Sequence, residues 1–314
     1  MNTGVYYHYW SVEGDANTYQ NLRSPILLSI ATLRATNPLI PIVVLQEHQC
    51  QNNWSHFPEK LNFRVQPIEF TLEKHHGDKP GWKHLSRIFD LERYAEHDTV
   101  IYSDVDVFWL RDILPLRCDP QKFCFNGNNT GHFYYCQSSD TVQQFFEVFK
   151  AFTISALHDE TIRDLMKKHA YDAWYYVFDE MIATYMYNEK HKHLFSTMTA
   201  NDHACIRNIH MVDFSLIKML HCNGLLVAND YSKIPCEKKH CRGLCCLLFK
   251  ELYDLICKVL NEKDLSSIFT SRELSYFLPQ QFSLEKDYGR ILNTKSSDNH
   301  YHLQRCLKNN RLLV

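Results

Sequence analysis

Two aspartates separated by one residue follow an apolar run in the segment TVIYSDVDVFWLRD, residues 99–112. If the chain stays extended through them, Asp104 and Asp106 point to the same side, because side chains at i and i+2 share a face of a strand. Two unpaired carboxylates held together repel, and one of them would have to take up a proton. A divalent cation removes this cost, and hard oxygen ligands suit Mg²⁺ or Mn²⁺. The segment therefore predicts a metal site, although one aspartate could instead cap the following turn while the other pairs with Arg111.

The elements around this segment predict an α/β domain. Apolar runs indicate four strands, at residues 4–10, 40–46, 63–70 and 99–110. Helical spacing indicates two helices, at residues 24–35 and 82–96. Their order along the chain is typical of a nucleotide-binding, Rossmann-like domain with a mostly parallel sheet flanked by helices. Ligands of such sheets bind beyond the carboxyl ends of the strands, where Asp104 and Asp106 lie.

The second half of the sequence predicts more helices, and its composition changes near the C-terminal end. A turn-rich centre, NGNNTG, separates two strand-like ends in residues 123–135, and helices are expected at about 140–152 and through much of 160–190. Beyond residue 235 the sequence becomes rich in cysteine, and we expect one domain over 1–235 with a Cys-rich, mainly helical extension over 236–314. No C-x₂-C pair recurs there, which favours free thiols or a local disulfide over zinc for four cysteines: Cys236, Cys241, Cys245 and Cys246.

Composition and charge argue against several classes of protein. The 314 residues are 45% hydrophobic and 22% charged, as in an ordinary globular protein, and a net charge of −2 gives no reason to expect nucleic-acid binding. No glycine-rich phosphate loop of either common type occurs, and no apolar run is long enough for a transmembrane segment. The start, MNTGVYYHYWSVEGD, lacks the basic and apolar regions of a signal peptide, so we expect a cytoplasmic protein.

Two segments together resemble a known family. VIYSDVDVFWLRD and NTGHFYYCQSSDTVQQFFEVF (129–149) are similar to the nucleotide-diphospho-sugar glycosyltransferases of GT-A fold, in particular the retaining group that contains plant arabinosyl- and xylosyltransferases. The resemblance covers roughly residues 4–233. It implies transfer of a sugar from a nucleotide sugar, with a UDP-sugar as the preferred donor, to a glycan, protein or lipid acceptor. It also implies that Mn²⁺ or Mg²⁺ bridges the diphosphate to Asp104 and Asp106.

The resemblance also implies a donor-binding role for the helix that precedes the two aspartates. Lys83 and Arg87 are four residues apart and therefore share a helical face. Either cation would contact the diphosphate or a sugar hydroxyl. A solvated basic face, with Arg87 paired to Asp90, is an equally good interpretation of the same spacing.

Further donor contacts are implied near the first strand and in the NTG segment. Aromatic residues at the end of the first strand would stack on the base, although strand packing explains them equally well. The NTG residues would hold sugar hydroxyls, and they also favour a hairpin turn. The residues concerned are Tyr6, His8, Tyr9, Asn129, Thr130 and Gly131.

Catalytic residues and a third metal ligand are implied further along the chain. Asp179 and Glu180 stand where the family usually has Asp-Gln, and a carboxylate there would orient the acceptor or stabilise positive charge at the anomeric carbon. The change to glutamate puts the second position in question, and an exposed acidic helix start is the alternative. His221 and Gly224 resemble the segment that completes the metal shell, with Lys233 on phosphate although it lies further from the glycine than usual.

Three other functions share parts of this pattern. A sugar nucleotidyltransferase would carry a glycine-rich loop after the first strand, and residues 10–20 lack one. A catalytically inactive GT-A binding module would have lost its metal ligands, whereas both aspartates and His221 are present. A metal-dependent phosphoesterase or nuclease would need more clustered His and Asp motifs than these.

Overall fold

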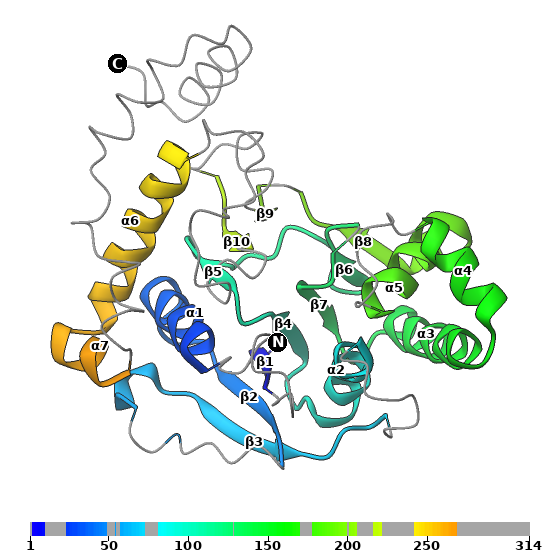
Figure 1. Ribbon diagram of the computed structural model, residues 1–314, viewed down its shortest axis with the longest axis horizontal. Helices are drawn as coiled ribbons and strands as arrows, with labels where there is room; N and C mark the ends of the chain where they lie inside the picture. The colour runs from blue at the N-terminus through cyan, green and yellow to red at the C-terminus, as the bar shows by residue number, and fades with distance from the viewer. Residues whose placement is uncertain are drawn as a thin grey trace, which may run out of the picture.

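The computed structural model describes most of the chain up to residue 268. The described residues are 2–9, 23–48, 54, 57–72, 81–127, 129–169, 178–199, 201–205, 216–221 and 242–268. Within them, an α/β architecture surrounds a large mixed sheet (Figure 1). No helix in these ranges is both long and apolar enough to cross a membrane.

The large sheet has seven strands in the order β3-β2-β1-β4-β7-β6-β8. Four neighbouring strands, β3, β2, β1 and β4, run parallel, whereas β7 is antiparallel to both β4 and β6, and β8 is parallel to β6. This arrangement confirms the expected mostly parallel, Rossmann-like start. The strands are β1 (Thr3–Tyr9), β2 (Ile42–Glu47), β3 (Arg64–Ile68), β4 (Thr99–Ser103), β6 (Phe123–Phe125), β7 (His132–Cys136) and β8 (Phe195–Thr197).

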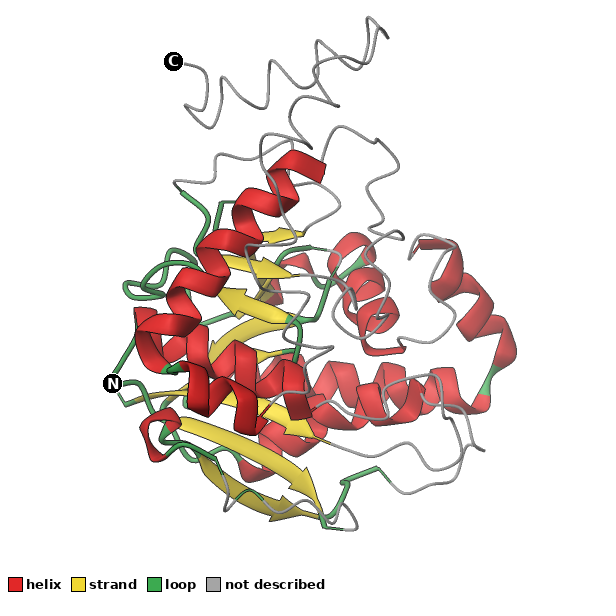
Figure 2. Cartoon of the chain, turned by 60° about the vertical axis from the view of Figure 1, so that its left-hand side comes forward, coloured by secondary structure: helices red, strands yellow, loops and turns green. Residues whose placement is uncertain are grey.

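Helices cover both faces of this sheet, which explains why its central strands are apolar on both sides. Val5 and Tyr7 pack with α1 and α6 on one face, whereas Tyr6 between them belongs to the cluster containing α2, α3 and α5. Figure 2 shows α6 running alongside the strands. The helices are α1 (Arg23–Thr36), α2 (Gly81–Tyr94), α3 (Asp140–His158), α4 (Glu160–His169), α5 (Phe178–Glu189), α6 (Arg242–Val259) and α7 (Glu262–Ile268).

The expected single strand over residues 99–110 is wrong. β4 ends at Ser103, a turn follows, and β5 (Val107–Trp109) belongs to a second, three-stranded sheet. The second sheet has the order β5-β10-β9, with β9 at His203–Cys205 and β10 at Met219–His221. The turn forms because the amide of Val107 donates to the carbonyl of Asp104 at 3.2 Å. Strand alternation therefore does not explain how the two aspartates meet.

The C-terminal helices contact the α/β core within the described residues. Leu252 and Ile256 of α6 are buried in the same cluster as Ile30 of α1, and Leu265 of α7 joins them. Two short 3₁₀ helices, Glu59–Leu61 and Lys192–Leu194, complete the described elements. The expected division into 1–235 and 236–314 stays a prediction, and the side chains of Cys236, Cys241, Cys245 and Cys246 lie outside the described part. Cys257 on α6 is an exposed free thiol.

Candidate active site

Asp104, Asp106 and His221 converge at the carboxyl end of β4. One ligand atom from each side chain lies within 4.8 Å of the other two, and His221 Nε2 is 3.2 Å from Asp106 Oδ1. Each comes from a different place: the end of β4, the turn before β5, and the last residue of β10. The pairing of His221 with Val107 in the second sheet brings the histidine to the two carboxylates.

The turn that places the aspartates is anchored to the NTG segment. The amide of Asp104 donates to the carbonyl of Gly131 at 2.7 Å, and the amide of Gly131 donates to Asn129 Oδ1 at 2.6 Å. A Cβ on Gly131 would lie 2.5 Å from His221 Cε1 and 2.9 Å from Asp104 Oδ2. Only glycine therefore lets the backbone pass this close to the two metal-ligand candidates.

Arg87 is the buried cation of the site, and it is not on a solvated face. Its Nη1 lies 2.6 Å from Asp104 Oδ1, while Nε and Nη2 lie 2.7 and 2.6 Å from Asp179 Oδ2. Nη1 also donates to the hydroxyl of Tyr102 and Nη2 to that of Thr130. Four hydrogen bonds and one further ion-pair contact thus hold the guanidinium within the protein. Arg87 joins the end of β4 to the start of α5.

The charges of the cluster favour a bound cation. Burial raises the pKa of Asp104, and nearby Asp106 adds to this although Arg87 opposes it. Burial disfavours the imidazolium of His221, but Asp106, with smaller contributions from Asp104 and Glu180, more than offsets burial and raises the pKa of His221. A divalent cation would satisfy both carboxylates and take the place of the proton on the imidazole. Two carboxylates and one imidazole suit Mn²⁺, and they suit Mg²⁺ less well because of the nitrogen ligand.

Asp179 and Glu180 begin α5 next to this cluster. Asp179 is fully buried, and its Oδ2 also accepts a hydrogen bond from Thr130 at 3.0 Å. Its other oxygen, Oδ1, is buried without a hydrogen-bond partner. Burial, together with the charge of Asp179, raises the pKa of Glu180 to about 8. The site thus holds one spare buried acceptor and one carboxyl group that retains its proton at neutral pH.

The first-strand candidates make contacts of their own within the protein, and their role in donor binding stays a prediction. The Tyr6 hydroxyl contacts His97 Nδ1 at 2.6 Å, at the amino end of β4. His8 Nε2 contacts Asp90 Oδ2 at 2.9 Å, so Asp90 is the partner of His8 rather than of Arg87. Tyr9 packs its ring edge against Trp54. Lys83 lies in α2, but its side chain is outside the described part of the chain. Gly224 and Lys233 lie outside the described residues altogether.

Sequence reasoning missed three residues that adjoin the site. Tyr102 donates its hydroxyl hydrogen to Asp104 Oδ1 at 2.5 Å, and its position two residues earlier on the strand was a usable signal. His132 directly follows Gly131, and His203 lies on β9 next to His221. Nothing in the sequence near His203 indicates this neighbour, because β9 and β10 are separate short strands.

Comparisons with known proteins agree with this architecture. No family model and no curated protein sequence matches the chain. Among solved structures, an active-site mutant of LgtC is 14% identical with a TM-score of 0.51, covering 85% of this chain and all of LgtC. The galactosyltransferase LgtC with donor and acceptor sugar analogs is 12% identical, with a TM-score of 0.49 and coverage of 84% and 99%. The glycosyltransferase GlyE of Streptococcus pneumoniae is 11% identical, with a TM-score of 0.46 over 69% of this chain.

The chain has the GT-A fold. The match to the LgtC mutant covers 85% of this chain, which itself forms a mostly parallel sheet flanked by helices. The chain spans only 54% of the length of GlyE.

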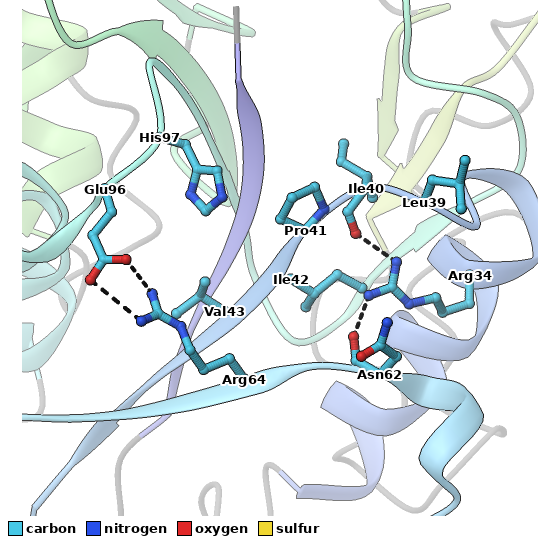
Figure 3. Close-up of a pocket in the computed structure, with 10 residues that line it drawn as sticks. All are labelled: Arg34, Leu39, Ile40, Pro41, Ile42, Val43, Asn62, Arg64, Glu96 and His97. Carbon is cyan, nitrogen blue, oxygen red and sulfur yellow. Dashed lines mark hydrogen bonds and ion pairs between the residues drawn. The ribbon is translucent and has the colours of Figure 1, made fainter.

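A pocket of about 390 Å³ lies at the opposite end of the GT-A sheet (Figure 3). Its walls come from the amino ends of β2 and β3 and from the residues before β4. The Arg34 side chain donates hydrogen bonds to the backbone carbonyls of Leu61 and Ile40. Arg64 forms an ion pair with Glu96 at 2.8 Å. Because these charges are already paired and the aspartates lie at the other strand ends, this pocket is not the candidate site.

Gly131→Ala is expected to weaken Mn²⁺ binding by about tenfold or more, because the new methyl group displaces His221 or Asp104. Isothermal titration with Mn²⁺ measures the change. Gly4→Ala is the matched control, since its Cβ would meet the His97 ring at 2.5 Å at the opposite end of the sheet. Equal Mn²⁺ affinities for the two variants would contradict the placement of Gly131.

Glu180→Gln is expected to flatten the pH dependence of stability. The folded protein holds the Glu180 proton up to about pH 8, whereas the unfolded chain releases it near its ordinary pKa. The folded state therefore binds more protons between these values, and the free energy of unfolding falls as pH rises from about 5 to 8. Urea denaturation at three pH values tests this, with exposed Glu147→Gln as the control. An unchanged slope in Glu180→Gln would refute it.

Proposed function

We propose that this protein is a metal-dependent glycosyltransferase that moves a sugar from a nucleotide sugar, of which a UDP-sugar is the first choice, to an acceptor. The observation that supports this most strongly is the convergence of Asp104, Asp106 and His221 at the carboxyl end of β4 in a GT-A fold. Ligands of open α/β sheets bind beyond these strand ends. A cation held there is placed to meet the diphosphate of the donor.

The metal-ligand set would be Asp104, Asp106 and His221, with Mn²⁺ preferred to Mg²⁺. When bound, the cation supplies Lewis-acid stabilisation of the departing nucleoside diphosphate. The chain's own residues prepare this site before any ligand arrives. Arg87 and Tyr102 both hydrogen-bond Asp104 Oδ1, which leaves Oδ2, the oxygen nearest Gly131, as the more available ligand atom.

Asp179 and Glu180 would act on the sugars. The unpartnered buried Oδ1 of Asp179 is an acceptor for a sugar hydroxyl, since a buried carboxylate oxygen gains from a hydrogen bond. Glu180 stands where the family usually has glutamine. With its pKa raised to about 8, a protonated Glu180 donates a hydrogen bond at neutral pH as an amide would. Asn129, Thr130 and Gly131 would act by shaping the turn at Asp104 rather than through free side-chain groups.

The proposed reaction displaces the nucleoside diphosphate at the anomeric carbon. The bond from this carbon to the phosphate oxygen breaks, the acceptor oxygen forms the new bond, and its proton passes to the leaving phosphate. Retention of configuration, giving an α-glycoside from common UDP-hexoses, rests on the resemblance of the two sequence motifs to the retaining group. The acceptor class, whether glycan, protein or lipid, stays open.

Donor hydrolysis tests the proposal. Purified protein is incubated with a panel of UDP- and GDP-sugars, with and without Mn²⁺, and the released nucleoside diphosphate is measured. Mn²⁺-dependent release from one donor, lost in the double variant Asp104→Ala and Asp106→Ala, is the expected result. Release of pyrophosphate from a sugar phosphate and a nucleoside triphosphate would instead indicate a nucleotidyltransferase. No release, together with no Mn²⁺-dependent thermal shift with UDP or GDP, would indicate an inactive GT-A module.

A further inference from the structure

Three buried histidines form a row that leads away from the candidate metal site. His221 stacks beside His203 with ring centroids 5.6 Å apart and an interplanar angle of 22°, and His132 lies 5.6 Å beyond His203. Their exposed fractions are 5%, 2% and 0%. The row crosses from β10 and β9 in the small sheet to β7 in the large one.

Four ring nitrogens of this row are buried without a hydrogen-bond partner. They are His221 Nδ1, His203 Nε2 and both nitrogens of His132. Leaving a buried polar group unpaired is costly, so four of them in one row indicate that a polar species binds against the ring edges. Burial lowers the pKa of His132 to about 3 and lowers that of His203, so both rings are neutral, each with one N–H and one lone pair.

The spacing of the rings fits water better than a second metal ion. Among the described residues, three ligand atoms come within 4.8 Å of one another only in the group of Asp104, Asp106 and His221. The row therefore does not converge tightly enough for an ion of its own. A buried water needs only two to four polar partners at about 2.8 Å, and the unpartnered ring nitrogens can supply them.

The hydrogen-bond partners decide which nitrogen carries each hydrogen. Asn126 Nδ2 lies 3.0 Å from His203 Nδ1, and an amide nitrogen can only donate, so the hydrogen of His203 is on Nε2. His221 faces Asp106 with Nε2, which must present its lone pair to a cation. Its Nδ1 then carries the hydrogen and needs an acceptor. A water can accept from both rings and donate its own hydrogen to a lone pair of His132.

We propose that His203 and His132 are positioning residues, which hold a buried water against Nδ1 of His221 and so fix the histidine tautomer that binds the cation. This inference rests on the metal site of the proposed function. It adds two residues outside the ligand set, and neither touches donor or acceptor in the proposal. Partners of this kind orient a ligating imidazole, and their loss typically costs about 10–100-fold in metal affinity.

Mn²⁺ titration calorimetry of the full chain tests the roles of the two histidines. His203→Phe and His132→Phe keep a planar ring but remove the nitrogens, and each is expected to weaken Mn²⁺ binding about tenfold or more. His203→Gln keeps a polar amide and is expected to stay within about threefold of the wild type. His97→Phe, a buried histidine at the opposite end of the sheet, is the matched control and should leave Mn²⁺ affinity unchanged.

A measurement on the wild type guards against variants that fail to fold. Long-range ¹H–¹⁵N spectra with Mg²⁺ report the tautomer of His221, whose signal is identified by its loss in His221→Gln. Hydrogen on Nδ1 supports the inference, and hydrogen on Nε2 in the Mg²⁺-bound protein overturns it. Wild-type Mn²⁺ affinity in both Phe variants would overturn the inference but leave the proposed function standing. No Mn²⁺ binding by the wild type would overturn both.

Discussion

Arg87→Met is expected to lower the free energy of unfolding by about 3–5 kcal/mol. The substitution leaves two buried or half-buried carboxylates, Asp104 and Asp179, without the cation that pairs with them. It also removes the donors to Tyr102 and Thr130. Methionine fills similar space, so the loss reports the charge and its hydrogen bonds rather than a cavity. Urea denaturation at constant pH measures the change.

Arg64→Met is the matched control for this prediction. Arg64 also pairs with a carboxylate, that of Glu96, but both side chains are about half exposed, so the expected cost is about 1 kcal/mol or less. Arg87→Lys should fall between the wild type and Arg87→Met, because one ammonium cannot reach both carboxylates and two hydroxyls in the fixed geometry of the guanidinium. Equal losses for Arg87→Met and Arg64→Met would show that Arg87 does not stabilise the cluster.

Asp106→Asn is expected to reduce metal-dependent donor turnover by about 100-fold or more. The amide keeps the size and shape of the side chain but removes the negative charge that faces His221 and would face the proposed cation. Lewis-acid stabilisation is worth several kcal/mol, and a loss of about 3 kcal/mol corresponds to about 100-fold in rate. The rate of nucleoside diphosphate release at saturating Mn²⁺ measures the effect.

The control for Asp106→Asn is Asp112→Asn, an exposed aspartate six residues further on whose Oδ1 accepts from the amide of Leu114. It should retain wild-type turnover. A second readout, Mn²⁺ affinity without donor, should fall in Asp106→Asn and stay constant in Asp112→Asn. Full turnover in Asp106→Asn would mean that the convergence of the three side chains has no catalytic role.

The sequence predicted the parallel start of the sheet because its strands are buried on both faces and read as continuous apolar runs. It could not predict the break after Ser103. The residues on either side, TVIYS and VFWL, both favour a buried strand, so nothing local distinguishes one long strand from two short strands in different sheets. The metal-ligand pair was found from its chemistry, but the turn and the His221–Val107 pairing that assemble it are tertiary features.

The partners of Arg87 likewise could not be predicted from the local sequence. Helical spacing placed it on one face of α2, and the nearest acidic residue in the sequence, Asp90, was the obvious partner. The structure pairs Asp90 with His8 on β1 and Arg87 with Asp179, 92 residues away. Partners this distant leave no periodic signal, and neither does the contact between His203 and His221. Local pattern therefore identified the charged groups, and the fold decided which of them meet.

Anomalous scattering from crystals grown with Mn²⁺ and UDP would test the central claim most directly. The account predicts one Mn²⁺ peak within coordination distance of an Asp104 oxygen, an Asp106 oxygen and His221 Nε2, with the diphosphate of UDP completing its shell. A Mn²⁺ peak at another place, or UDP bound without Mn²⁺ near these three side chains, would contradict it.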